Sequence, residues 1–165
     1  MISVSHRVGR LAEIRLTSPV VVDDFTVMQR DMAALGSKSH AKLVVCADLS
    51  RASVFPEPLA DRIGRFFRSD HQRLDRVAIV VGDAATFYLQ VDRLLRYVSA
   101  TQVSARDFGL HSAPKRGIDP SLKRLATRRA FKHPSEAISW LEDALSPEER
   151  ARLRTFFDES PKSTH

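Results

Sequence analysis

Short apolar runs alternate along this chain with segments whose apolar residues are spaced for one face of a helix. The runs 43–47 and 77–81 are apolar on both faces, and the first of them ends in Asp48, Leu49 and Ser50. Such short, doubly apolar runs are typical of strands buried between two layers of helices. Because helical spacing separates the two runs, the pattern predicts a parallel pair of strands at the centre of an α/β sheet.

The first third of the chain predicts two strands and two helices around this pair. Residues 1–9 and 10–17 alternate as two strands joined by a turn near Gly9. A helix is expected from Asp23 or Asp24, which would cap it, to a stop at Gly36. Pro58 suits the first turn of the next helix.

The remainder of the chain predicts three further helices and one strand. Asp83 is placed to cap a helix that reaches about Ser99. Residues 128–131 are expected to form a short last strand, followed by a helix that opens at 133–136. Ser146, Pro147 and Glu149 form a strong helix start, with a capping serine and a glutamate three residues later.

Composition is that of a single globular domain. The 165 residues are 43% hydrophobic and 28% charged, and no apolar run approaches the length of about 20 residues that spans a membrane. The N-terminus shows no export signal. The one cysteine, Cys46, excludes an internal disulfide and suits a reducing compartment, so a cytoplasmic location is expected. Its place in the middle of a strand predicts a core residue rather than a reactive thiol.

The net charge of +6 is concentrated in one segment, residues 106–132. Such asymmetry favours either an anionic partner or a solvated loop and strand edge. No aromatic residues are interleaved with these charges, which argues against single-stranded nucleic acid. The residues that we assign to an anionic-partner patch are Lys115, Arg116, Lys123, Arg124, Arg128 and Arg129.

Candidate catalytic chemistry is sparse. Asp48 and Asp83 end neighbouring strands, where open α/β sheets hold ligands, and two carboxylates there could bind a divalent cation. A third acidic ligand and a phosphate-binding loop are not evident, so a turn residue and a helix cap explain the two aspartates more simply. The six histidines are scattered without ligand spacing. The sequence therefore predicts no enzyme, no metal and no cofactor.

Three segments together resemble a known family. They are the strand ending 45–50, the strand ending 80–83, and the closing stretch 129–141 with its Glu136, Ala137, Trp140 and Leu141. In this order and spacing they resemble the SpoIIAA-like, or STAS/Sec14-like, bacterial proteins. The resemblance implies a mixed, mostly parallel sheet with helices packed on it over residues 1–145. Residues 146–159 would add an extra C-terminal helix, and 160–165 a flexible tail.

The resemblance also implies a function. STAS domains act as non-enzymatic switches that bind a partner protein under control of a serine at the start of the helix after the Asp-Leu-Ser strand end. The matching position here is a proline, so switching by phosphorylation at the usual serine is not expected. We assign partner binding, or self-association, to the loop and helix start that contain Ser50, Ser53, Phe55 and Glu57.

An alternative function follows from the Sec14-like side of the resemblance. A hydrophobic pocket between helix and sheet would carry or sense a lipid-like ligand, and the basic segment would face an anionic membrane surface. Core packing explains the same aromatic residues more simply. The residues that could line such a pocket, besides Phe55, are Phe66, Phe67, Phe87 and Tyr88.

Overall fold

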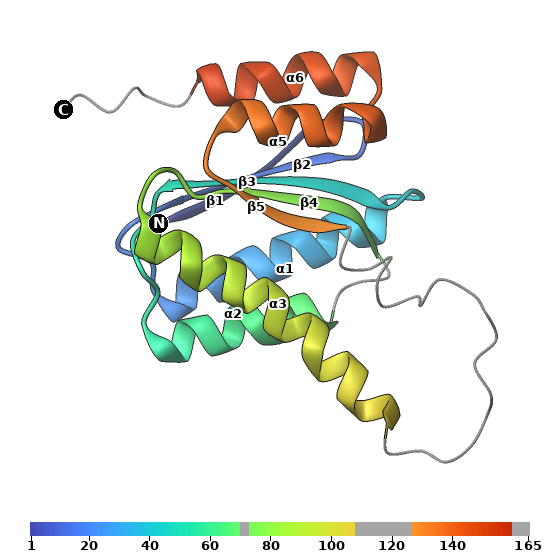
Figure 1. The fold of residues 1–165 in the computed structure, drawn as a ribbon. Helices are drawn as coiled ribbons and strands as arrows, with labels where there is room; N and C mark the ends of the chain where they lie inside the picture. Colours follow the sequence, from blue (N-terminus) through green and yellow to red (C-terminus); the bar gives the residue numbers. More distant parts are fainter. Residues whose placement is uncertain (70–72, 108–126, 160–165) are drawn as a thin grey trace.

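A five-stranded sheet runs through the centre of the molecule (Figure 1). The computed structural model describes residues 1–69, 73–107 and 127–159, and of residues 67–69 and 97–107 only the backbone. The strands lie side by side in chain order, and only the first pair is antiparallel. The predicted α/β class with a mixed, mostly parallel sheet is thus confirmed. The strands are β1 (Ile2–Val8), β2 (Leu11–Thr17), β3 (Leu43–Arg51), β4 (Leu74–Val80) and β5 (Arg128–Phe131).

Three helices cover one face of this sheet: α1 (Val22–Lys38), α2 (Glu57–Ser69) and α3 (Ala85–Asp107). Each connects two neighbouring parallel strands. Because crossovers of one hand that all advance in the same direction keep to one side of a sheet, the three helices share a face. Alternate residues of the strands point into the core that they enclose, among them Ile14, Leu16, Val45, Ala47, Val77 and Ile79.

The other face is covered by the C-terminal elements α5 (Pro134–Leu141), η2 (Glu142–Ala144) and α6 (Pro147–Asp158). The remaining alternate strand residues form a second, smaller core with them. This core includes Leu11, Val44, Cys46, Val80, Leu141, Leu145, Leu153 and Phe156. The central strands are therefore buried on both faces, as their continuous apolar runs predict.

Several expected helix ends are wrong by a few residues. The residue that precedes α1 is Val21, and Asp24 lies in the first turn, where its carboxylate accepts the Val21 N–H at 3.5 Å. Gly36 lies inside α1, which continues to Lys38. Ala84, not Asp83, precedes α3, because its carbonyl accepts the Tyr88 N–H. The same helix extends past Ser99 to Asp107.

The capping box of α6 is confirmed. The Ser146 hydroxyl accepts the Glu149 N–H at 3.2 Å, and the Glu149 carboxylate accepts the Ser146 N–H at 2.8 Å.

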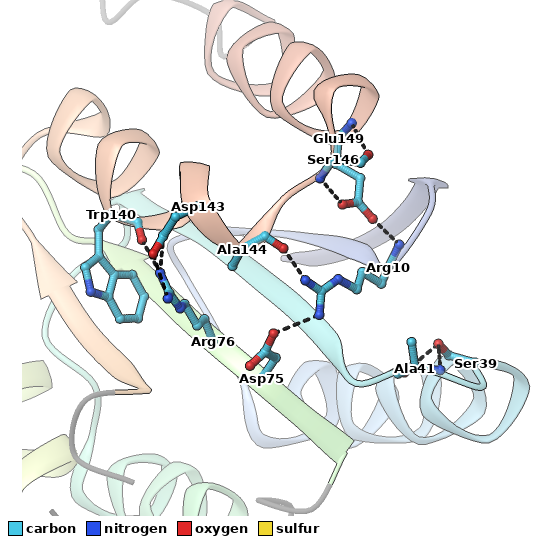
Figure 2. Close-up of polar contacts among 10 residues, drawn as sticks. All are labelled: Arg10, Ser39, Ala41, Asp75, Arg76, Trp140, Asp143, Ala144, Ser146 and Glu149. Carbon is cyan, nitrogen blue, oxygen red and sulfur yellow. Dashed lines mark hydrogen bonds and ion pairs between the residues drawn. The ribbon is translucent and has the colours of Figure 1, made fainter. Parts of the chain in front are cut away.

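Three arginines of the sheet layer hold the C-terminal elements through backbone carbonyls (Figure 2 shows two of them). Arg10 donates to the Ala144 carbonyl and Arg76 to the Trp140 carbonyl. Arg15 donates to the carbonyl of Phe156, whose ring lies 4.3 Å from the guanidinium carbon. Since the carbonyls at a helix C-terminus lack partners within the helix and carry partial negative charge, cationic donors suit them.

Two carboxylates on either side of the same interface are almost fully buried. Glu149 is 4% exposed and accepts the Arg10 N–H at 2.6 Å, above Gly9. Glu13 is 1% exposed and receives two hydrogen bonds from Arg152, at 2.5 and 2.8 Å, and one from Ser5 at 2.8 Å. Glu13 is thereby paired with a cation, whereas Glu149 is satisfied by backbone N–H groups, those of Arg10 and Ser146. The two carboxylates tie α6 to the N-terminal hairpin, 139 residues away in sequence.

Cys46 lies beneath α5 and α6, on the face of β3 that also carries Asp48. Burial raises the pKa of its thiol well above the usual value, and the Asp48 and Glu13 carboxylates raise it further. The thiol therefore stays protonated at neutral pH and acts as a small core residue, as the sequence predicts.

Candidate functional site

The loop between β3 and α2 leaves the sheet at the carboxyl ends of the parallel strands. The Asp48 carboxylate accepts the Ser50 backbone N–H at 3.0 Å and the Ser50 hydroxyl at 2.6 Å. Gly82 turns the end of β4 past Ser50 with a φ of 76°, a conformation that favours glycine. Asp48 and Ser50 both lie within β3, so the turn interpretation is wrong, and their hydrogen bonds fix the end of the strand just before the loop.

A pair of serines fastens the middle of this loop to the segment that follows β2. The Ser18 hydroxyl accepts the Ser53 N–H at 2.7 Å, and the two hydroxyl oxygens lie 2.8 Å apart. The Ser18 N–H also donates to the Arg51 carbonyl at 3.2 Å. The predicted partner-binding residue Ser53 is exposed, and its hydrogen bonds fix the backbone next to it.

A glutamine on α3 fastens the next part of the loop. The side chain of Gln90 accepts the Phe55 N–H at 2.8 Å, and its amide group donates to the Phe55 carbonyl at 2.8 Å. Both backbone groups of one residue are therefore satisfied by one side chain. Nothing in the sequence indicates this contact, because a single glutamine forms no motif and its partner lies 35 residues earlier.

Phe55 itself points inward, so its predicted role as a contact residue for a partner needs correction. The side chain is 5% exposed, and its ring packs edge-to-face on Phe87 with 5.0 Å between ring centres. Aromatic burial stabilises the loop from below, and in this conformation a partner cannot reach the ring. Ser50, Ser53 and Glu57 are exposed at the surface.

Exposed apolar side chains lie in this loop, at the start of α1 and near the start of α3. They are Val21, 54% exposed, Val22, 38%, Val54, 48%, and Leu89, 65%. Val54 lies between the residue bonded to Ser18 and the residue bonded to Gln90, which places it between the start of α1 and the start of α3. We call Val21, Val22, Val54 and Leu89, with the segment 50–57 that runs from the end of β3 through the loop to the first residue of α2, the docking surface. It lies where α1, α2 and α3 begin (Figure 1).

An apolar cavity of about 60 Å³ lies beneath the loop, between the sheet and the three helices. Its wall is entirely apolar and includes Met28, Met32, Phe55, Ile63 and Val91. An engineered apolar cavity of about 150 Å³ stays dry and binds benzene or xenon. The space here is smaller, and it has no polar group to hold water.

The residues predicted to line a ligand pocket are divided by the structure. Phe66 lines the cavity, as does Phe55. Phe87 is 1% exposed and packs behind Phe55 instead. Tyr88 lies under the Lys132 ammonium, 5.7 Å from it. The Phe67 side chain lies outside the described residues.

The structure describes two members of the predicted anionic-partner patch, Arg128 and Arg129, which lie on β5. The exposed Arg129 guanidinium lies 5.9 Å from the centre of the Trp140 ring, which Arg76 also approaches, at 5.5 Å. The sequence does not reveal Trp140 as a neighbour of these arginines, because it lies outside the basic segment. The other members, Lys115, Arg116, Lys123 and Arg124, lie outside the described residues.

Among the described residues, no group of three or more histidine, cysteine or acidic side chains is arranged to hold a metal ion. Asp48 is buried and bonded to Ser50, whereas Asp83 is exposed. Open α/β sheets form their ligand crevice where two successive crossover helices lie on opposite faces of the sheet. Here the described strands follow the order of the chain, and the crossover helices α1, α2 and α3 share one face, so the described part of the sheet has no such point.

Within the described ranges, none of the helices combines the length and the apolar character that crossing a membrane requires. Comparison of the chain with models of known protein families, with curated proteins and with solved structures found no match.

Proposed function

We propose that this protein is a non-enzymatic, STAS-like regulatory module whose docking surface binds another protein. The observation that carries the proposal is the presence of four exposed apolar side chains in a loop that hydrogen bonds hold in place and at the starts of α1 and α3. Large apolar side chains gathered at the surface are typical of protein-binding sites. Because Ser18 and Gln90 already fix the loop, a partner would not have to order it, and this saving favours affinity.

Charged substitutions on the docking surface test this function. Val54→Asp combined with Leu89→Asp places two charges where a partner would exclude water, whereas Val27→Asp changes another exposed valine, on α1, 46% exposed. A partner is first identified by affinity capture with the wild-type protein and is then purified. Its affinity, measured by calorimetry, is expected to fall at least tenfold for the double variant, about 1.4 kcal/mol, and to stay unchanged for Val27→Asp.

Circular dichroism of both variants controls for folding. Equal affinity of the double variant and the wild-type protein would remove the docking surface from the function.

The carrier of a lipid-like ligand remains a second hypothesis, which the wholly apolar cavity favours. Its volume of about 60 Å³ is far below the roughly 300 Å³ at which small-molecule pockets begin, so an acyl chain would require the helices to move. Organic extraction of freshly purified protein, followed by mass spectrometry, is expected to release an apolar compound if the protein is a carrier. An extract without any such compound would contradict it.

A further inference from the structure

One residue, Phe55, links the interior of this molecule to its surface. Its ring forms part of the wall of the apolar cavity, and its backbone N–H and carbonyl are both bonded to Gln90 on α3. Val54, the central apolar residue of the docking surface, is its neighbour in the chain. A change on one side of Phe55 therefore reaches the other side through a single peptide unit.

We propose that the cavity is a binding site for a small apolar molecule and that Phe55 couples its occupancy to the docking loop. The wall offers no hydrogen-bond partner, so the ligand must be apolar. The volume of about 60 Å³ is well below the roughly 150 Å³ of a cavity that binds benzene, so the ligand must be smaller than a benzene ring. This inference rests on the proposed function for the consequence of the coupling, but the binding and the coupling are measurable without a partner.

Two methionines allow the cavity to adapt to such a ligand. Met28 and Met32 lie one turn apart on α1, are 5% and 3% exposed, and both contribute to the wall. Methionine has an unbranched, flexible side chain that readily changes its conformation to fit a neighbour. The opposite wall is formed by β-branched strand residues such as Val45, Val77 and Ile79, which are stiff. The cavity can thus enlarge on the side of α1 without moving the sheet.

The coupling follows from what happens when the loop opens. If residues 50–57 lift away and carry the Phe55 ring with them, the cavity loses part of its wall and releases its occupant. A ligand that binds only the closed state stabilises that state by mass action. Occupancy therefore adds to the stability that the Ser18 and Gln90 hydrogen bonds already give the closed loop, and by linkage a protein bound to the docking surface retains the ligand.

Xenon, which is smaller than benzene, serves as the probe in the test. Titration of the methyl-labelled protein is expected to shift the NMR signals of cavity residues such as Met28, Met32 and Ile63. In Ala47→Val, which adds two methyl carbons to the wall of the cavity, probe affinity is expected to fall at least tenfold. The matched control is Val27→Ala, which changes an exposed residue of α1 outside the docking surface and is expected to keep the wild-type affinity. Absence of any shift at the cavity residues would overturn the proposal.

Hydrogen exchange tests the coupling. At a probe concentration of nine times its Kd, exchange of the Phe55 amide is expected to slow about tenfold, because the open state releases the probe. Exchange of the Arg10 amide, which is bonded to Glu149 on the other face of the sheet, is expected to change less. Probe binding with unchanged Phe55 exchange would overturn the coupling. Either negative result leaves the test of the docking surface with a purified partner unaffected.

Discussion

At the scale of single residues, two glycines of this chain differ in whether their position requires glycine. Gly9 has a φ of 53°, and a Cβ on it would overlap the buried Glu149 carboxylate. Gly36 lies within α1, and a Cβ on it would meet only the flexible Arg73 side chain, at 3.1 Å. The first position needs glycine, and the second does not.

We therefore expect Gly9→Ala to destabilise the protein by about 2 kcal/mol or more, and Gly36→Ala to stabilise it by about 0.5–1 kcal/mol. The strained φ and the displaced carboxylate cause the loss, whereas the gain comes from the better helix propensity of alanine. Urea unfolding of the two variants measures both values. A loss of stability in Gly36→Ala would mean that Arg73 cannot move aside.

At the scale of elements, the attachment of α6 to the sheet depends on the pair Glu13–Arg152. The pair is almost fully buried, with the Arg152 side chain 11% exposed and the Glu13 side chain 1%. Removal of one partner from a buried pair leaves an uncompensated charge. Arg152→Leu is thus expected to cost about 3–5 kcal/mol of unfolding free energy.

The matched variant removes both charges. In Glu13→Leu combined with Arg152→Leu, most of that loss is expected to be recovered, because no charge remains buried. Chemical denaturation of the single and double variants gives the two values. A double variant as unstable as the single one would indicate that the pair itself, and not the isolated carboxylate, carries the stability.

A second contact of the same layer makes stability depend on pH. The Arg76 guanidinium donates to the Asp143 carboxylate and lowers its pKa below the usual value of 3.8. Because the folded pKa lies below the unfolded one, this contact stabilises the folded state above about pH 4, and the effect is lost as pH falls through the folded pKa. In Asp143→Asn, stability is expected to fall less steeply with acid below pH 4. Urea midpoints measured across pH 2.5–6 would contradict this if the two curves ran parallel.

The sequence predicts most of these elements, because long apolar periodicities and buried runs depend on local spacing. The strands β1–β5 and the start of α6 at Ser146 are local patterns of this kind. The end of α1 beyond Gly36 is not such a local pattern. The sequence alone does not distinguish a glycine within a helix from a glycine that ends one.

The parts of the site that sequence reasoning missed depend on distant contacts. Glu13 stands among apolar residues in β2 and appears as the solvated member of an alternating strand, yet Arg152 buries it. Gln90 has no neighbour in sequence that signals its bond to Phe55. The sequence places Phe55 in the loop but does not show that its ring points into the core. The direction of the ring depends on its packing against Phe87 of α3.

At the scale of the whole molecule, the two cores differ in what holds them closed. The core under α1–α3 is apolar, whereas the core under α5 and α6 is closed at its edges by arginines and buried carboxylates. The thiol of Cys46, 0% exposed in the second core, reports on the opening of that layer alone.

Labelling of Cys46 by a thiol reagent tests whether the layer opens separately. Under native conditions, Arg152→Leu is expected to accelerate labelling more than Met28→Ala, a cavity-forming change in the first core that costs a comparable 2–5 kcal/mol. The Met28 variant is the control for loss of global stability. Equal acceleration at equal loss of stability would mean that the thiol is exposed only when the whole molecule unfolds.

The bonds between α6 and the N-terminal hairpin have a consequence for how the protein is made. During synthesis the hairpin β1–β2 leaves the ribosome first, and each later strand can pair with the edge left by the previous one, since the sheet follows chain order. Glu13 and the Arg10 amide, however, receive their partners only when residues 149 and 152 emerge. A nascent chain that ends before residue 149 would therefore hold a paired sheet on which α6 is still missing, with the apolar residues that α6 covers and the Glu13 carboxylate open to chaperones.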